Sequence, residues 1–524
     1  MWVWTLFFVL PFFVTSHGAK ILAVFMTPSY SHQIVYQPIW RELSLRGHQV
    51  TVYTPNPLND KSLTNLTEYD LGFSYEVLKD HHFEDTKSPS ENLKKVLECY
   101  KKVFENQMSH KYLQDLIKNV NNETYDLFLV EYIWQSYYAI KEIYNVPMIG
   151  LTSLPLTLLA SDSLGMDKHP VLDPDIFVQF SFAETLKQRV FSWAYNWIYR
   201  IIVKPRWLGQ FNAEIKKYFG ERIKDVRQLA QEVSLVIGNY NFALQNIKPI
   251  TPKYVPVSSL HVRPRKALPT DLAQFMDNLK NDVIYFSLGT NVKSSQVSKE
   301  KIQQILNVLG RLPYTILWKY ETKNLPPNLP KNIIVRKWFP QQDLLGHPKV
   351  KLFITQAGIQ SLDESILREV PMLIIPFLFD QKINADKCVK LGIAESINFA
   401  DFTEDELETK INKLLNDQLY RKNIKEQARI ITDQPMSSVD TAVYWIEYVI
   451  RHKGASHLRY KSVDIPFYQY YMLDVYLFVA LISSLLFYIL KRIAVIVALS
   501  YTAFKKLIVA KIFNWRYTEE KKIK

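Results

Sequence analysis

Short continuous runs of hydrophobic residues alternate with stretches of helical spacing along the first part of the chain. The apolar run 21–26 is followed by apolar positions at helical spacing over 33–46 and by a second run at 50–53. Continuous apolar runs are typical of parallel strands that are buried on both faces. A strand, a helix and a strand within about 35 residues make a βαβ unit. The runs 127–131 and 147–151 repeat the pattern, which predicts a parallel sheet covered by helices.

A second series of the same kind begins at residue 283. The predicted strands are 283–288, 315–318, 333–335, 352–355 and 372–377, and the predicted helices are 299–309 and 360–368. Five prolines between 249 and 269 indicate a linker between the two series. We therefore predict an α/β protein with two Rossmann-like domains, 19–248 and 270–470. Ligands of such sheets bind at the carboxyl ends of the strands, which places the site in the cleft between the domains.

The hydrophobic pattern changes near the C-terminus. Residues 475–490 are uncharged and almost wholly apolar, and basic residues follow them. This run is slightly shorter than the roughly 20 residues that cross a bilayer, so we predict a transmembrane helix over 471–492 with its ends in the interface. A buried core helix is the alternative. A shorter apolar run at 493–504 is flanked by lysines and is expected to lie along the membrane surface, within a basic cytosolic tail, 493–524.

The N-terminus predicts entry into the secretory pathway. An apolar run over 3–14 precedes Ser16-His17-Gly18, which is the pattern of a signal peptide that ends at residue 18. The basic residues that normally begin such a peptide are missing, so a membrane-anchored or structural first segment is the alternative. With the tail in the cytosol, the body of the chain is expected in the lumen as a single-pass type I protein, and Asn65 and Asn122 lie in glycosylation sequons. Lysines 521 and 522 resemble the dilysine retrieval signal of endoplasmic reticulum membrane proteins, although they could simply extend the basic tail.

Composition excludes several classes of protein. The chain carries 64 Lys and Arg against 51 Asp and Glu, and the segment 491–524 alone contributes +7 of the net +13, so the positive charge does not indicate nucleic-acid binding. The 14 glycines are nowhere spaced as a dinucleotide fingerprint, a P-loop or a nucleophile elbow. The two cysteines, Cys99 and Cys388, are too far apart for a CxxC pair and are interpreted as free.

Aromatic residues are concentrated between 177 and 219, where they are 12 of 43 residues, about twice the chain average of 14%. Leu186, Val190, Trp193, Trp197 and Ile201 form a stripe at helical spacing. The stripe fits an apolar acceptor pocket, a helix at a membrane interface, or an ordinary amphipathic helix that faces a core.

The segment 338–381, WFPQQDLLGHPKVKLFITQAGIQSLDESILREVPMLIIPFLFDQ, is the most specific motif in the chain. It closely resembles the signature of the UDP-glycosyltransferase family, which includes the UDP-glucuronosyltransferases. The FSLGT sequence at 286–290, Ser31-His32 and Val146-Pro147 extend the resemblance over nearly the whole chain. It implies two Rossmann-like domains of the GT-B type, with the UDP-sugar held by the C-terminal one.

The resemblance assigns a role to each part of the signature. Trp338 would stack on the uracil, Glu364 would accept the ribose hydroxyls, and Asp380-Gln381 would hold the sugar. The loop before the helix at 360–368 would offer its N–H groups to the diphosphate. The expected UDP-sugar-binding residues are Ser287, Thr290, Trp338, Gln341, Gln356, Gly358, Gln360, Ser361, Glu364, Asp380 and Gln381.

The chain departs from the family pattern at this loop. Gln356 and Ala357 replace a His-Gly pair, and Gln360-Ser361 replaces a frequent Asn-Gly. Gln356 is similar to insect-type members. Ala357 adds a methyl group where the backbone is expected to approach the phosphates, which puts the tightness of diphosphate binding in question.

The resemblance at Ser31-His32 makes His32 the expected general base, with Glu131 as its orienting carboxylate. Inversion at the anomeric carbon follows, since UDP leaves from the opposite face. No metal or cofactor is expected. Asp173-Pro174-Asp175 imitates a metal-binding DxD motif but does not follow a strand, and the ligand-rich residues 80–84 are interpreted as a solvated loop.

We therefore expect a metal-independent enzyme that transfers a hexose from a UDP-sugar to a hydroxyl of a small lipophilic acceptor. Glucose is the favoured sugar because Asp380 and Gln381 suit neutral hydroxyls, and Gly238 aligns where glucuronosyl members have an arginine. Arg263 or Arg265 could replace that arginine, so UDP-glucuronic acid is an alternative donor. A non-catalytic relative that binds nucleotide-sugar or lipophile is a second alternative, and a homo-oligomer is left open.

Overall fold

The computed structural model describes residues 18–78, 89–294, 297–322, 325–377 and 380–523. The chain up to Tyr460 forms one compact unit, and Lys461–Lys524 forms another. The predicted signal peptide, apart from Gly18, and the cluster at 80–84 lie outside the described residues.

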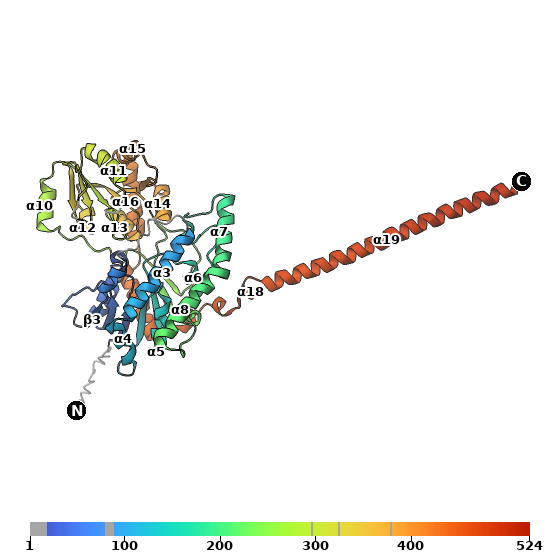
Figure 1. Cartoon of the computed structure of the whole chain (residues 1–524), viewed down its shortest axis with the longest axis horizontal. Coiled ribbons are helices and arrows are strands. Elements are labelled where there is room, and N and C mark those ends of the chain that lie inside the picture. Colours follow the sequence, from blue (N-terminus) through green and yellow to red (C-terminus); the bar gives the residue numbers. More distant parts are fainter. Residues whose placement is uncertain (1–17, 79–88, 295–296, 323–324, 378–379, 524) are drawn as a thin grey trace, which may run out of the picture. The chain divides into compact units, whose positions relative to one another are not determined.

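The first unit contains two parallel sheets (Figure 1). The first sheet has the strand order β3-β2-β1-β4-β5-β6-β7. Its strands are β1 (Lys20–Val24), β2 (Gln49–Thr54), β3 (Leu66–Asp70), β4 (Leu127–Glu131), β5 (Met148–Thr152), β6 (Leu235–Asn239) and β7 (Tyr254–Val257). Its helices are α1 (Tyr30–Gln33), α2 (Gln37–Leu45), α3 (Pro89–Met108), α4 (Lys111–Lys118), α5 (Ala139–Tyr144), α6 (Leu158–Ser163), α7 (Leu186–Ile198), α8 (Lys204–Phe219) and α9 (Val226–Gln231).

The second sheet has the order β10-β9-β8-β11-β12-β13. Its strands are β8 (Val283–Ser287), β9 (Thr315–Lys319), β10 (Ile333–Arg336), β11 (Val350–Thr355), β12 (Met372–Ile374) and β13 (Ala394–Ser396). Its helices are α10 (Thr270–Asn278), α11 (Lys299–Arg311), α12 (Gln341–Leu345), α13 (Ile359–Leu367), α14 (Asp380–Lys390), α15 (Glu404–Asn416) and α16 (Gln418–Thr432). The two predicted Rossmann-like halves are therefore present.

Both faces of the central strands are buried, which explains their continuous hydrophobicity. Along β1, Leu22 and Val24 enter the core on one face of the first sheet, whereas Ile21 and Ala23 enter the core on the other. β7 lies inside the segment expected to be a linker. β7 is an edge strand, so one side of it has no neighbouring strand. Pro256 is tolerated there because its missing N–H costs no hydrogen bond to a neighbouring strand on that side.

The last helix of the first unit, α17 (Ser438–Arg451), returns to the first sheet after the second sheet is complete. Its Ala442, Val443, Ile446 and Val449 belong to the same core as α2 and β1. The N-terminal sheet is therefore covered on one face by residues that follow the C-terminal sheet in the sequence.

The second unit contains α18 (Phe467–Tyr470) and the 50-residue helix α19 (Leu473–Lys522). α19 is long and apolar enough to cross a membrane. It continues without interruption beyond Leu490, so the two apolar runs expected to behave separately lie on one helix.

Candidate active site

Loops from both sheets line a cavity of about 810 Å³. The first sheet contributes the segment after β1, with Ser31 and His32, and the second contributes the loops after β8 and β11 together with α12, α13 and the start of α14. Parallel strands end at one edge of each sheet, so this is the position expected for a ligand of paired α/β sheets. His32 and each of the eleven predicted UDP-sugar-binding residues line this cavity, whereas Glu131 does not.

The end of the cavity that is expected to receive the nucleotide has an aromatic platform. Trp338 is 50% exposed, and the ring of Tyr30 meets its ring edge-on at 5.2 Å between centroids. The Nζ atom of Lys319 lies 5.7 Å from the Trp338 ring. An indole of this exposure offers a flat surface on which a base can stack.

Glu364, which lines the same cavity, is fixed by two side chains. Gln341 donates from Nε2 to Glu364 Oε2 at 2.7 Å, and Nε2 of His261 lies 3.4 Å from Glu364 Oε1. Burial works against a charged imidazole, but the hydrogen bond with Glu364 and its negative charge raise the pKa of His261 above the ordinary value. The carboxylate is thus held in one orientation, in which it can accept hydrogen bonds from hydroxyl groups.

His261 was not predicted. It belongs to the proline-rich segment interpreted as a linker, and a single histidine in a loop has no pattern that marks it. Its position just after the edge strand β7 was the only available signal, and that strand was not predicted either.

The loop before α13 contains the unusual Ala357. Its φ angle is 64°, in the left-handed region that favours glycine. Its side chain is fully buried and belongs to the core of the second sheet, and Ala357 is not among the residues that line the cavity. The methyl group therefore points into the core and does not obstruct the backbone N–H groups at the N-terminus of α13, which can bind an anion.

The facing loop is shaped by Gly289. Its φ angle is 77°, and a Cβ atom there would lie 2.4 Å from Nε2 of Gln356. Gly289 thus allows the Gln356 amide to enter the space between the two loops. Gln356 Oε1 is buried and has no hydrogen-bond partner among the described residues, so this amide retains hydrogen-bonding capacity for a ligand.

The end of the cavity that is expected to receive the sugar is formed by the start of α14. Asn384 donates to Asp380 Oδ2 at 2.8 Å and to the backbone oxygen of Ala357 at 3.0 Å, which connects this helix to the loop before α13. Gln381 accepts through Oε1 from the Phe377 N–H at 2.8 Å. Burial raises the pKa of Asp380 to about 6.

His32, which follows β1 of the first sheet, lines the same cavity. Its Nδ1 atom lies 3.0 Å from Oγ of Ser153, which follows β5. Burial lowers the pKa of His32 to about 4, so the imidazole is neutral at pH 7. No hydrogen bond within the described part of the chain engages its Nε2 atom, which is available to accept a proton.

Glu131 does not contact His32 by any hydrogen bond within the described residues. Its carboxylate accepts from the N–H groups of Met26 and Thr27, at 3.1 and 2.9 Å, and from the Thr27 hydroxyl at 2.7 Å. Burial raises its pKa. The expected pairing of Glu131 with His32 is thus replaced in the structure by Ser153, because the loop after β1 already satisfies the carboxylate.

Ser153 is the second site residue that the sequence did not reveal. It lies two residues after the apolar run 147–151 that predicted β5, at the same sheet edge as His32, and this position was its only signal. Besides His32, it receives a hydrogen bond on its carbonyl from Gln360 Nε2 at 3.2 Å, and its N–H donates to the Tyr36 hydroxyl at 2.9 Å. Ser153 therefore connects His32 to helix α13.

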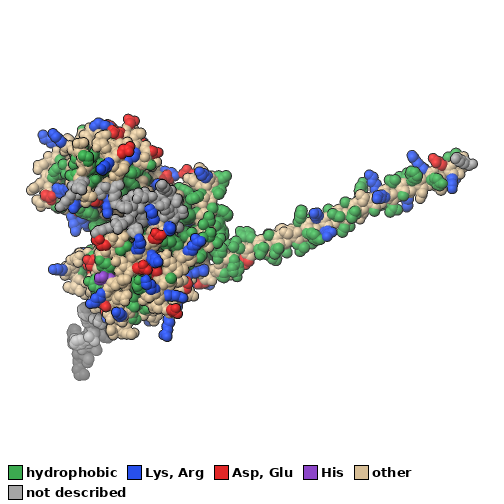
Figure 2. Space-filling view, viewed as in Figure 1, with side chains coloured by type: hydrophobic (Ala, Val, Ile, Leu, Met, Phe, Trp, Pro, Cys, Tyr) green, Lys and Arg blue, Asp and Glu red, His purple; other side chains and the backbone are tan. Residues whose placement is uncertain are grey.

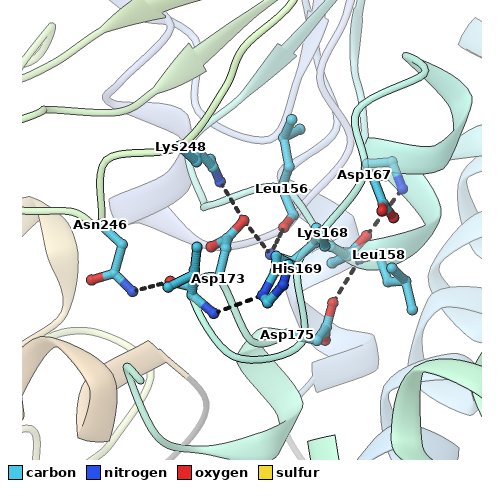
Figure 3. A network of polar contacts seen from close by, with 12 residues as sticks. Leu156, Leu158, Asp167, Lys168, His169, Asp173, Asp175, Asn246 and Lys248 are labelled. Carbon is cyan, nitrogen blue, oxygen red and sulfur yellow. Dashed lines mark hydrogen bonds and ion pairs between the residues drawn. The ribbon is translucent and has the colours of Figure 1, made fainter. Parts of the chain in front are cut away.

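Asp173 and Asp175 take part in a separate polar network (Figure 3). Asp173 pairs with Lys248 at 3.0 Å and with Lys168 at 3.5 Å, and Asp175 accepts from the Leu158 N–H at 2.6 Å. These contacts hold the 167–175 loop in place. Among the described residues, no cluster of three or more His, Cys, Asp or Glu side chains is arranged to hold a metal.

Comparison with known proteins assigns this architecture. The family model described as UDP-glucoronosyl and UDP-glucosyl transferase matches residues 19–507. The chain belongs to this family. It is 30% identical over 497 residues to UDP-glucosyltransferase 2 of Dactylopius coccus, covering 91% of this chain and 93% of that one. It is 29% identical over 498 residues to UDP-glucuronosyltransferase 1A3 of Rattus norvegicus, covering 91% and 92%.

Solved structures agree on the fold of this UDP-glycosyltransferase. TcCGT1 in complex with UDP aligns with a TM-score of 0.57 at 13% identity, covering 83% of this chain and all of that one. A UDP-glucosyltransferase from Polygonum tinctorium aligns with a TM-score of 0.55 at 15% identity, covering 83% of this chain and all of its own length. The two parallel sheets are thus the GT-B arrangement, and the activity is glycosyl transfer from a UDP-sugar.

Proposed function

We propose that this UDP-glycosyltransferase transfers glucose from UDP-glucose to a hydroxyl group of a small lipophilic acceptor, with inversion and without a metal or cofactor. The observation that carries the mechanism is His32, a neutral imidazole held by Ser153 on the wall opposite the donor loops. Nε2 takes the proton of the acceptor hydroxyl while its oxygen forms a bond to the anomeric carbon. The bond from that carbon to UDP breaks on the opposite face, and UDP leaves with the electron pair.

The donor residues act by position and hydrogen bonding. Trp338 and Glu364 hold the uridine, the N-terminus of α13 receives the diphosphate, and Asp380 and Gln381 receive the sugar hydroxyls. Backbone N–H groups and the helix dipole stabilise the negative charge that develops on UDP.

Replacing His32 with alanine tests the mechanism. We expect His32→Ala to lower kcat by roughly 100-fold or more while UDP still binds, as for the loss of a general base. Turnover in purified protein and UDP affinity by calorimetry measure the two effects. Near-normal turnover would refute the role of His32, and wild-type protein that binds UDP but transfers no sugar to any acceptor would favour the non-catalytic alternative.

Glucose is favoured because the arginines near the cavity are engaged or absent from it. Arg263 makes two hydrogen bonds to Asp343, at 2.8 and 2.7 Å, and Arg265 is not among the residues that line the cavity. At Gly238 a Cβ atom would lie 2.3 Å from the Tyr254 hydroxyl oxygen, so no larger residue fits there without a shift. A C6 carboxylate would therefore find no arginine free to receive it at these three positions.

One observation favours UDP-glucuronic acid as a second candidate donor. Lys387 lines a small cavity with Asp380, and burial lowers the pKa of this lysine to about 8. Comparing kcat/KM for the two donors on the purified enzyme decides between them. A higher value with UDP-glucuronic acid that falls in Lys387→Met would identify the carboxylate-binding lysine and overturn the glucose assignment.

For the location, we propose an endoplasmic reticulum protein with α19 across the membrane, the body in the lumen and the tail in the cytosol. Asn65 and Asn122 are both exposed, as glycosylation requires. Protease added to intact microsomes should remove only the tail after about residue 491. Digestion of the 19–460 body would contradict the luminal placement.

A further inference from the structure

Segment 179–184 connects the 3₁₀ helix η5 (Ile176–Val178) to α7, in the part of the chain that builds the first sheet. Its side chains contact α14, which belongs to the second sheet. Lys382, Asp386 and Lys390 follow one another at intervals of four residues and therefore share one face of α14. The contacts are Lys382 Nζ to Gln179 Oε1 at 3.0 Å, Ser181 Oγ to Asp386 Oδ2, and Lys390 Nζ to Glu184 Oε1 at 2.9 Å.

The three contacts differ in strength. The Lys390 and Glu184 side chains are both more than half exposed, and ion pairs of this kind add little stability. Ser181 is buried, and its hydroxyl donates to a carboxylate. Hydrogen bonds to charged acceptors are stronger than those between neutral groups, so the bond from Ser181 to Asp386 is the central contact of the three.

Loops of the first sheet hold segment 179–184 in place. Asn246 donates from Nδ2 to the backbone oxygens of Ser181 and Leu172. Asn246 is part of the polar network that holds the 167–175 loop (Figure 3). The first sheet therefore determines where the segment lies, and a shift of the segment would shift α14.

α14 begins with the proposed sugar ligands Asp380 and Gln381. Phe180 and Ser181 line a small cavity together with Asp380, so the segment comes close to this end of the helix. α14 is a single helix of 11 residues, in which the hydrogen-bonded backbone fixes the turns relative to one another. The position of Asp386 within it therefore determines the position of Asp380.

The segment has no direct part in the uridine site. None of its residues is among those that line the cavity of about 810 Å³ in the described part of the chain. Trp338, Gln341 and Glu364, which are proposed to bind uridine, precede α12 or lie on α12 and α13. Any effect of the segment on the donor therefore passes through α14, which separates sugar recognition from uridine recognition.

We propose that Ser181 and its segment position the sugar-binding start of α14, so that the N-terminal half of the enzyme contributes to recognition of the donor hexose but not of UDP. This rests on the proposed function, in which Asp380 and Gln381 hold the sugar. Ser181 is a positioning residue, because it contacts Asp386 and not the donor. A shift of α14 weakens the hydrogen bonds to the hexose hydroxyls and leaves the uridine contacts as they are.

The test compares the KM for the donor with the Kd for UDP in Ser181→Ala. We expect the donor KM to rise roughly ten-fold and the Kd for UDP to stay within about two-fold. Steady-state kinetics of the full-length enzyme give the first value, and calorimetry gives the second. The donor is the UDP-hexose with the higher kcat/KM in the wild-type enzyme, so the test does not depend on which sugar is transferred. Ser181→Thr keeps the hydroxyl, has the small cavity beside it for the added methyl group, and should restore most of the wild-type KM.

A double-mutant cycle tests whether the effect passes through Asp386. Once Asp386 is replaced, the Ser181 hydroxyl has lost its acceptor on α14. The Ser181→Ala, Asp386→Ala double variant should therefore raise the donor KM no further than Asp386→Ala alone. Additive rises would contradict positioning through this contact.

Helix α7 supplies the matched control. Its hydrophobic side chains are gathered on the surface (Figure 2), with Leu186 69% and Trp193 58% exposed, so its apolar stripe does not face a core. Its Ser192 is buried, and the Ser192 hydroxyl has no partner among the described residues. Ser192→Ala therefore removes a buried hydroxyl without breaking a hydrogen bond, and should leave the donor KM and the Kd for UDP unchanged.

Two results would overturn the proposal. One is an unchanged donor KM in Ser181→Ala, and the other is a rise in donor KM that is matched by an equal rise in the Kd for UDP. Asp380→Ala separates these results from a failure of the proposed function. A normal kcat/KM in Asp380→Ala would refute the sugar site itself, whereas a lowered kcat/KM there with a normal donor KM in Ser181→Ala would refute only the positioning by segment 179–184.

Discussion

His32 Nδ1 and Ser153 Oγ lie 3.0 Å apart, so a serine hydroxyl orients the expected base of this UDP-glycosyltransferase. Ser153 is buried and is itself fixed through its backbone by Tyr36 and Gln360. This arrangement leaves Nε2 of His32 toward the cavity. Glu131 acts indirectly, because its carboxylate accepts hydrogen bonds from Met26 and Thr27 and so fixes the loop that leads to His32.

This contact predicts a selective loss of turnover in Ser153→Ala. A hydrogen bond worth about 1 kcal/mol corresponds to roughly a five-fold change in rate, so we expect kcat to fall 5- to 20-fold. The KM for UDP-glucose should change little, and Ser153→Thr should restore most of the rate because it keeps the hydroxyl. Ser161→Ala, which removes a buried hydroxyl without a partner among the described residues, is the control. A normal kcat in Ser153→Ala would show that this hydroxyl does not orient the base.

The pKa values of His32 and Asp380 predict different pH limits for turnover and donor affinity. Burial lowers the pKa of His32 to about 4, so the imidazole remains an unprotonated base until the pH falls near that value. Burial raises the pKa of Asp380 to about 6, so its carboxylate becomes neutral below that pH. Initial-rate measurements should therefore show KM for UDP-glucose rising below about pH 6 while kcat holds to about pH 5. A kcat that falls in parallel near pH 6.5 would indicate a base with an ordinary histidine pKa.

Ala357 predicts a near-neutral effect of glycine and a large effect of valine. Ala357→Gly relieves the positive φ angle but removes a buried methyl group, so we expect the free energy of unfolding to change by less than about 1 kcal/mol. The affinity for UDP should stay within about three-fold, because the methyl group lies outside the cavity. Ala357→Val should destabilise by about 2 kcal/mol, since a β-branched residue tolerates this φ poorly. Denaturant unfolding and calorimetry measure both, and a large gain in UDP affinity in Ala357→Gly would place the methyl against the diphosphate.

The contact of His261 with Glu364 predicts a donor-binding defect in His261→Ala. Loss of this partner leaves the Glu364 carboxylate, the proposed ribose ligand, with Gln341 as its remaining side-chain partner among the described residues. KM for UDP-glucose should therefore rise roughly ten-fold with a smaller change in kcat. His347→Ala, at a second buried histidine that does not line the cavity, should leave KM unchanged. A fall in kcat alone would assign His261 to the chemical step.

The strands that bear the site were predictable because each is a continuous apolar run with a chemical group at its end. The residues that complete the site were not, since Ser153 and His261 are single polar positions whose importance depends on which strand ends meet in space. Helix α17 could not be assigned to a sheet from the sequence, because an apolar stripe at helical spacing can pack against the face of either sheet. For α7, the helical spacing was recognised but the sequence left open what its apolar stripe faces, since a hydrophobic stripe does not state what covers it.

The return of α17 to the first sheet makes the chain interleaved. During synthesis, the face of the first sheet that packs against Ile446 and Val449 stays uncovered until the C-terminal half has been made. A hybrid enzyme joined between 258 and 269 would take its first sheet from one parent and the helix that seals it from the other. Exchange of N-terminal halves between relatives therefore requires that residues 438–451 be exchanged together with the N-terminal sheet.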